Sequence, residues 1–177
     1  QDPDVIMIGE IRDLETAEIA VQSSLTGHLV FSTLHTNDAV SAVVRMVDLG
    51  IERFLLVSSL RAVLAQRLVR RICADCKEEK GLASEILGDS FSGEDFHLYE
   101  GKGCSRCGNS GYSGRVGLYE ILVVDEALSR GVSKGGDLVE LTKIAQESGF
   151  KTMYEDGLAK AKAGITSLAE VIRVAGR

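Results

Sequence analysis

Residues 5–13 read VIMIGEIRD, and this stretch decides the fold. Val5 to Gly9 carry no polar side chain and are rich in β-branched residues. A strand with one wet face alternates apolar and polar residues, so this unbroken run predicts a strand buried on both faces of a parallel sheet. Glu10 then stands at the carboxyl end of the strand, where open α/β sheets bind their ligands. Taken alone, the pattern also fits a core strand with a solvated end.

A helix is expected next, over residues 13–26. Its apolar positions recur at helical spacing and form one face. Asp13 is suited to cap its first turn, and Gly27 is suited to end it.

Residues 28–35, HLVFSTLH, predict a second buried strand. Strand, helix and strand in this order form a βαβ unit, which pairs its strands in parallel through a right-handed crossover. The second strand is therefore expected to bring Thr33, His35 and Asn37 to the same sheet edge as Glu10. Thr36, Asn37 and Asp38 can cap a further helix.

Several motifs now resemble one known family, the type II secretion and type IV pilus-assembly ATPases. DPDVIMIGEIRD (residues 2–13) and TGHLVFSTLHTNDA (residues 26–39) are similar to its Walker B and His boxes. LETAEIAVQSSLTGH is more similar to the secretion branch, the GspE-like proteins, and LAQRLVRRIC, GCSRC and GYSGRVGLYE extend the resemblance. It implies an α/β fold, namely the C-terminal half of a RecA-like P-loop NTPase sheet, and a homo-hexameric enzyme.

The resemblance also implies roles for residues at this edge. Glu10 is expected to orient the attacking water, directly or through Mg²⁺, although acidic residues upstream of this chain are expected to share or own that role. His35 is expected to sense the γ-phosphate of ATP. Thr33 and Asn37 are expected to help bind the nucleotide, and Arg12 to pair near Glu10 or reach a subunit boundary.

His28 is expected to have a different role from His35. The two histidines are separated by seven residues of extended chain, roughly 23 Å at about 3.3 Å per residue. Both cannot touch one phosphate, so a structural role is expected for His28.

No stretch matches G-x-x-x-x-G-K-[ST], the loop whose amides cradle phosphates. The run GKGCS at Gly101 lacks the upstream glycine and the strand-to-helix context. The chain is therefore expected to be a fragment that begins after the phosphate loop, and to be inactive alone.

All four cysteines form two C-x-x-C pairs, Cys73/Cys76 and Cys104/Cys107. Two such knuckles can complete a tetrahedral Cys₄ site for a structural Zn²⁺, which has no open position for a substrate. Disulfides are the alternative, and a reducing compartment disfavours them. His97 is a possible substitute ligand, but a surface position is expected. The residues between the pairs, including GDSFSGEDFH (residues 88–97), are rich in Gly, Ser and acidic side chains and show little periodicity.

The charge balance argues against nucleic acid as a partner. The chain has a net charge of −6, and residues 73–115 hold eight acidic against five basic side chains. Phosphate-binding proteins carry an excess of Lys and Arg. The local cluster of Arg67, Arg70 and Arg71 is expected to be solvated or to face a subunit.

Three segments are expected along the chain. Residues 1–72 are assigned to the ATPase core, 73–115 to the tetracysteine zinc module, and 116–177 to a return strand and a C-terminal all-α lobe. The elements expected after the His box are helices at 39–49 and 54–64, a strand at 66–72, one or two strands at 116–124, and helices at 137–147, 153–163 and 167–174.

The sequence thus predicts part of an ATPase that powers protein secretion and pseudopilus assembly. ATP, Mg²⁺ and structural Zn²⁺ are its expected cofactors, and inner-membrane secretion-platform proteins its expected partners. No apolar run approaches the roughly 20 residues that a membrane span needs, and no signal peptide opens the chain, so a cytoplasmic location is expected. A pilus-assembly ATPase and an inactive zinc-stabilised docking module are the alternatives.

Overall fold

The computed structural model describes residues 3–87 and 95–176, so residues 88–94, part of the segment between the cysteine pairs, lie outside the described residues. The chain forms two compact units. Unit 1 comprises residues 1–65 and 120–150, and unit 2 comprises residues 66–119 and 151–177. This division does not coincide with the three consecutive segments expected from the sequence, because two of its three boundaries fall inside the long strands at 62–72 and 112–123.

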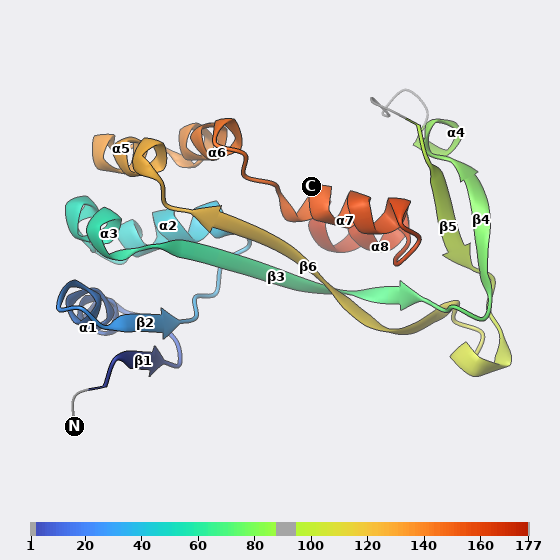
Figure 1. The fold of residues 1–177 in the computed structure, drawn as a ribbon, viewed down its shortest axis with the longest axis horizontal. Coiled ribbons are helices and arrows are strands. Elements are labelled where there is room, and N and C mark those ends of the chain that lie inside the picture. The colour runs from blue at the N-terminus through green and yellow to red at the C-terminus, as the bar shows by residue number, and fades with distance from the viewer. Residues whose placement is uncertain (1–2, 88–94, 177) are drawn as a thin grey trace. The chain divides into compact units, whose positions relative to one another are not determined.

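Unit 1 begins with the expected βαβ unit. Strands β1 (Val5–Ile8) and β2 (Leu29–Ser32) pair in parallel with Val5 opposite Leu29 (Figure 1). Helix α1 (Leu14–Leu25) connects them, and the Asp13 carboxylate caps it by accepting a hydrogen bond of 2.8 Å from the Thr16 N–H. The βαβ prediction is confirmed.

The expectation that β1 is buried on both faces is wrong for the described residues. Ile6 and Ile8 are half-buried, but Val5 and Met7 are exposed, Met7 by 66%. Leu29 and Phe31 are exposed in the same way on β2. Among the described residues, the helices cover one face of this two-stranded sheet and none covers the other.

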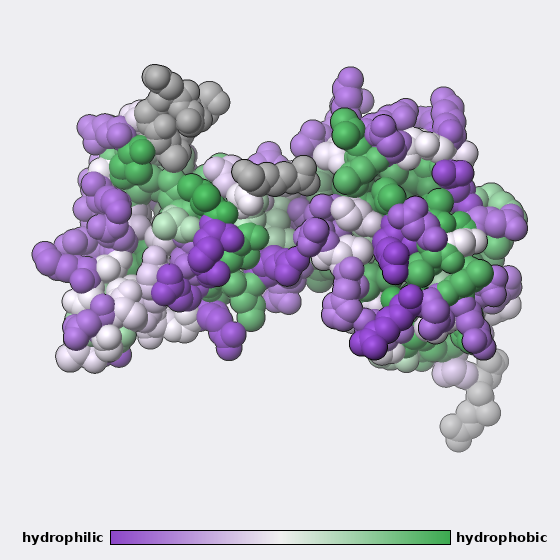
Figure 2. Space-filling view, turned by 180° about the vertical axis from the view of Figure 1, so that it is seen from behind, coloured by the Kyte–Doolittle hydropathy of each residue, from purple (hydrophilic) through white to green (hydrophobic). Residues whose placement is uncertain are grey.

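The remaining helices of unit 1 enclose its core. They are α2 (Ala39–Asp48), α3 (Arg53–Ser59), α5 (Glu126–Lys134) and α6 (Leu138–Glu147). Their buried side chains, such as Val43, Leu56 and Leu128, form one cluster with α1 and with Leu122. Hydrophobic residues also reach the surface in patches among charged side chains (Figure 2).

Two expectations fail in this part of the chain. The helix expected at 54–64 ends at Ser59, because residues from Ala62 onward belong to strand β3, where half-buried Val63 and Ala65 alternate with exposed Leu64. Helix α5 was not expected at all. The expected C-terminal all-α lobe is divided, since α5 and α6 belong to unit 1 whereas α7 and α8 belong to unit 2.

Strands β3 (Ala62–Ile72) and β6 (Tyr112–Val123) pair with each other and run in opposite directions (Figure 1). The strand expected at 66–72 is therefore present but longer, and β6 replaces the one or two short strands expected at 116–124.

Unit 2 also contains an antiparallel hairpin, β4 (Lys77–Leu82) and β5 (His97–Gly101), between the two cysteine pairs. The low periodicity of this region did not predict it. The short helix α4 (Ala83–Leu87) follows β4 directly, and η2 (Ser105–Cys107) follows β5.

Helices α7 (Met153–Lys162) and α8 (Leu168–Ala175) form the expected helical hairpin and pack on β5 through a small apolar cluster with Leu98. Ser167 and Glu170 have the three-residue spacing of a capping box. Only half of it forms, since the Ser167 hydroxyl accepts from the Glu170 N–H, while the Glu170 carboxylate binds Arg70 and Arg173. Two guanidinium groups compete for this carboxylate and bind it more strongly than one amide would.

Candidate functional site

The carboxyl ends of β1 and β2 are joined beyond the last paired residues. The Ile11 N–H donates to the Thr33 carbonyl over 2.9 Å, and the Thr33 hydroxyl donates to the Gly9 carbonyl over 2.7 Å. These bonds continue the pairing of the strands past Ile8 and Ser32. Glu10 and His35 are therefore held on adjacent stretches of backbone.

Glu10 lies between the guanidinium group of Arg12 and the imidazole of His35. One carboxylate oxygen, Oε2, is 2.5 Å from an Arg12 guanidinium nitrogen, and the other, Oε1, is 2.7 Å from His35 Nε2. The Glu10 side chain is 21% exposed, whereas that of His35 is 83% exposed. The three side chains form a partly shielded carboxylate at an open edge of the sheet.

The surroundings of Glu10 keep it ionised. The hydrogen bond from Arg12 lowers the pKa of Glu10, and the nearby charges of Arg12 and His35 act in the same direction. Oε1 is buried, and no described group makes an aligned hydrogen bond to it even though His35 is close. An ionised carboxylate at the edge of a sheet suits a hard cation such as Mg²⁺ or a water molecule.

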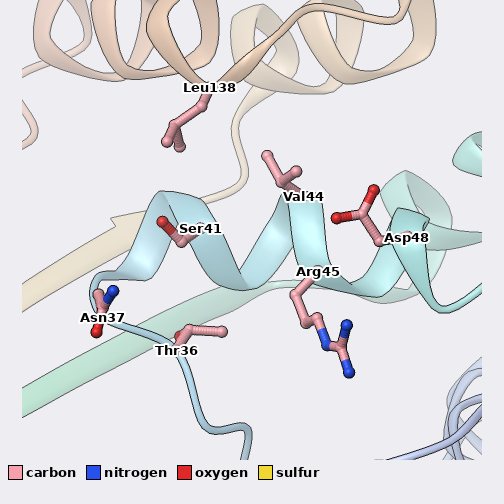
Figure 3. A pocket seen from close by; sticks show the side chains of 7 residues that line it. All are labelled: Thr36, Asn37, Ser41, Val44, Arg45, Asp48 and Leu138. Atoms are coloured by element: carbon pink, nitrogen blue, oxygen red, sulfur yellow. The ribbon is translucent and has the colours of Figure 1, made fainter.

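The structure does not gather all the residues expected at this edge. The Thr33 hydroxyl is engaged by the Gly9 carbonyl. Asn37 is exposed and lines a shallow depression of about 260 Å³ along α2, which neither Glu10 nor His35 lines. In Figure 3, Leu138 of α6 points into this depression from the side opposite Thr36.

His28 lies at the opposite end of β2. Its Nδ1 is 3.0 Å from the Ser23 carbonyl and 3.2 Å from the Thr26 hydroxyl, both at the end of α1. The contacts tie the start of the strand to the preceding helix. They agree with a structural role, and they separate His28 from Glu10.

A second carboxylate, Glu120 of β6, lies near the His box, and sequence reasoning missed this placement. Its Oε1 accepts a hydrogen bond of 2.6 Å from the Ala39 N–H at the start of α2. Glu120 is the last residue of the run GYSGRVGLYE, and it belongs to unit 1. The available signal was a Glu within the apolar run LYEILVV.

The four cysteines form a candidate metal centre in unit 2. All four sulfur atoms lie within 4.8 Å of one another. Cys73 is buried and the others are half-buried. Four thiol groups at this spacing fit a tetrahedral Zn²⁺ site, so the donor set matches the metal expected from the sequence.

Backbone amides surround these sulfur atoms as they do in metal-binding knuckles. The Gly103 N–H donates to Cys76 Sγ over 3.3 Å, and the Cys104 and Gly111 N–H groups donate to Cys107 Sγ over 3.2 and 3.3 Å. The amide of Cys104 lowers the pKa of Cys107 to about 6, whereas burial raises the pKa of Cys76 to about 12. A dication would stabilise all four as thiolates.

His97 does not belong to this cluster. It is exposed on β5, and its Nδ1 lies 2.7 Å from the Glu79 carboxylate. The expected surface position is confirmed.

Sequence comparison identifies the family. A family model described as type II/IV secretion system protein matches residues 1–173. The chain belongs to this family. The resemblance inferred from the Walker B and His boxes is thereby confirmed.

Individual relatives of this secretion family come from both branches. The chain is 54% identical to the type II secretion system ATPase E of Vibrio cholerae, covering 98% of this chain and 35% of that protein. It is 51% identical to the type II secretion system protein HxcR of Pseudomonas aeruginosa, covering 98% and 34%. It is 49% identical to the type IV pilus assembly ATPase PilB of Thermus thermophilus, covering 97% and 20%. The chain thus spans about a third or less of these relatives.

The fold is similar to part of a solved ATPase. The X-ray structure of the Legionella pneumophila ATPase DotB matches with a TM-score of 0.65 and 25% identity, covering 99% of this chain and 39% of that one. This chain is therefore a mixed α/β member of the secretion family with a four-cysteine cluster and C-terminal helices.

Proposed function

We propose that this chain is the C-terminal part of an ATPase that hydrolyses ATP to power protein secretion and pseudopilus assembly by a type II secretion system. One observation carries the proposal. The chain brings Glu10 and His35 together at the carboxyl edge of a parallel strand pair. The 54% identity to a type II secretion ATPase supports the assignment to a type II secretion system.

Each residue at the edge has a distinct task in this proposal. Glu10 holds the attacking water or the Mg²⁺ that accompanies ATP, because it is an ionised carboxylate at the carboxyl edge of the paired strands. The hydrogen bond from Arg12 lowers the pKa of Glu10. His35, exposed beside Glu10, contacts the γ-phosphate, while the Thr33 hydroxyl supports the backbone at this edge. Phosphoryl transfer depends mainly on such positioning and charge stabilisation.

The phosphate cradle of a P-loop NTPase fold must come from outside residues 1–177, which contain no G-x-x-x-x-G-K-[ST] motif. We therefore propose that the RecA-like sheet is completed by a longer polypeptide and that the chain alone has no measurable ATP turnover. The working enzyme is a homo-hexamer on the cytoplasmic side, bound to inner-membrane secretion-platform proteins. No helix among the described residues is long and apolar enough to cross a membrane.

The decisive experiment compares Glu10→Gln with the unchanged full-length protein. Turnover of ATP should fall by a factor of about 100 or more, as removal of a charged group at the reacting centre does elsewhere. Exposed Glu18, on α1, provides the matched control in Glu18→Gln. Full turnover in Glu10→Gln would contradict the assignment of this sheet edge to ATP hydrolysis.

The pilus-assembly branch is the second candidate, because the chain is also 49% identical to a PilB protein. The chemistry at Glu10 is the same in both candidates. Deleting the gene and following secretion and pilus extension separately distinguishes them, since only one process should stop.

For the chain alone, the proposal is a zinc-stabilised docking unit without activity or nucleic-acid binding. The four cysteines fill every coordination position of a tetrahedral ion, which leaves no place for a substrate. The acidic excess between residues 73 and 115 favours protein contact over phosphate contact. Salt-dependent DNA or RNA binding in a filter assay would contradict this.

A further inference from the structure

Glu120 lies on a face of β6 where the neighbouring side chains are aliphatic. Leu118 and Leu122, two residues to either side, are fully buried, and Glu120 on the same face is only 5% exposed. Burying a carboxylate costs free energy unless polar partners replace its water. A residue that departs from the local pattern in this way indicates a specific task at this point of the structure.

The Glu120 carboxylate binds the first amide of α2. Glu120 Oε1 lies 2.6 Å from the Ala39 nitrogen, 81 positions earlier in the chain. The first amides of a helix have no partner within the helix, and the helix dipole favours negative charge there. Asp38 takes a second amide of the same turn, that of Ser41, over 2.7 Å. One local and one distant carboxylate thus fix the start of α2.

This start lies only a few residues beyond His35. The intervening chain is Thr36, Asn37 and Asp38, and the Thr36 hydroxyl donates to the Asp38 carbonyl over 3.1 Å. Before His35, Thr33 is bound to Gly9 through its hydroxyl. The segment that carries the imidazole is therefore anchored on β1 at one end and on β6 at the other.

We propose that Glu120 is a positioning residue for nucleotide hydrolysis. By binding the Ala39 N–H it fixes the end of the His-box segment, so that His35 stays beside Glu10. The inference rests on the proposed ATPase function. The position of His35 depends on where the acceptor oxygen of Glu120 lies. The segment that carries His35 is short and anchored at both ends, so a shift of either anchor also shifts the imidazole.

Two variants of the full-length ATPase separate acceptor position from charge. Glu120→Asp keeps the charge and withdraws the oxygen by one methylene, so kcat should fall about 10- to 100-fold with KM changed less than about threefold. Glu120→Gln keeps an oxygen at the same reach and should retain kcat within about threefold. Exposed Glu126 is the matched control, and Glu126→Asp should leave both parameters unchanged.

A third variant removes the donor instead of the acceptor. Ala39 is the first helical residue and Asp38 before it is extended (φ −147°, ψ 172°), so the backbone accepts Ala39→Pro, which lacks the N–H. Its kcat should fall as in Glu120→Asp. This variant keeps the test decisive if Glu120→Asp does not fold.

The coupling to His35 distinguishes positioning from plain stability. In a His35→Ala background, Glu120→Asp should lower kcat by no more than about twofold further, because the group that it positions is already gone. The inference would be overturned if the decreases in kcat from His35→Ala and Glu120→Asp multiplied in the double variant. It would also be overturned if Glu120→Asp and Glu120→Gln lowered kcat equally, or if both kept full activity. The proposed function fails separately, if Glu10→Gln retains turnover.

Discussion

His35 Nε2 lies 2.7 Å from Oε1 of Glu10, although the two residues are 25 positions apart in the chain. The parallel register of β1 and β2 creates this contact, because it ends both strands at the same edge. The Thr33–Gly9 hydrogen bond then fixes the backbone beyond the strands. The short carboxylate–imidazole distance is thus a direct product of the βαβ topology.

Replacing Arg12 should raise the pKa of Glu10. In the unchanged chain the Arg12 hydrogen bond stabilises the ionised carboxylate and lowers its pKa below the ordinary value. In Arg12→Gln the carboxylate should therefore accept its proton at a higher pH. Carbon-13 NMR titration of the Glu10 carboxyl group measures this, with exposed Arg53→Gln as the control. An unchanged midpoint would show that Arg12 does not act on Glu10.

Metal analysis of the chain should give about one Zn²⁺ per molecule, and Cys104→Ser should lose it. Because structural zinc contributes roughly 10–16 kcal/mol of binding free energy, β4 and β5 should then lose protection from hydrogen exchange. The βαβ unit, which shares no residue with the cysteine cluster, should keep its protection. Ser105→Ala, next to Cys104, is the control. A chain that stays folded in unit 2 without metal would refute the zinc assignment.

Glu170→Gln should weaken the chain at neutral pH. The buried Glu170 carboxylate binds Arg70 and Arg173 at 2.7–2.9 Å, so its loss should lower the free energy of unfolding by about 2 kcal/mol. Chemical denaturation at pH 7 measures this difference, and the exposed Glu18→Gln should show none.

The free energies of unfolding of Glu170→Gln and of the unchanged chain should become similar in acid. The hydrogen bond from Arg173, with those from Arg70, lowers the pKa of Glu170. A carboxylate with a lowered folded-state pKa stabilises the fold fully above its unfolded pKa of about 4.3, and this contribution is lost as the pH falls below that value. The difference between Glu170→Gln and the unchanged chain should therefore shrink below about pH 4. A constant difference would contradict the ion-pair network.

Gly157→Ala should destabilise unit 2 although alanine favours helices. The gain in helix propensity is about 1 kcal/mol. The new Cβ, however, would lie 2.5 Å from Cγ1 of fully buried Val171, and overpacking of this kind costs about 1–3 kcal/mol. The melting temperature should therefore fall. In a chain that already carries Val171→Ala, adding Gly157→Ala should lower the melting temperature less than it does in the unchanged chain. An equal decrease in both chains would exclude the clash as the cause.

Local signals were sufficient for several elements. Asp13 and Asp38 both cap helices as predicted, because a carboxylate at this position satisfies free amides of the first turn. Gly27, with φ +105°, follows the end of α1 as expected. The two C-x-x-C pairs predicted a cluster of four thiols, since each pair turns its sulfur atoms to one point.

Tertiary competition explains the failures. The apolar run at 54–64 had no internal stop, and only the pairing of β3 with β6 ends the helix at Ser59. Glu170 matched a capping box but binds two arginines, one of them 100 positions away. The placement of Glu120 against Ala39 likewise joins distant parts of the chain.

The sequence alone determined the βαβ order, the cysteine cluster, the helix caps and the family, because each depends on residues that are close together in the sequence or form a contiguous motif. The tertiary structure decided the rest. It set Glu10 against His35, left one face of β1 exposed among the described residues, divided the C-terminal helices between two units, and placed a carboxylate of β6 on the first turn of α2. The reason is that local spacing fixes only backbone conformation and the face that each side chain takes, whereas the partner of a buried charge depends on which distant strand packs beside it.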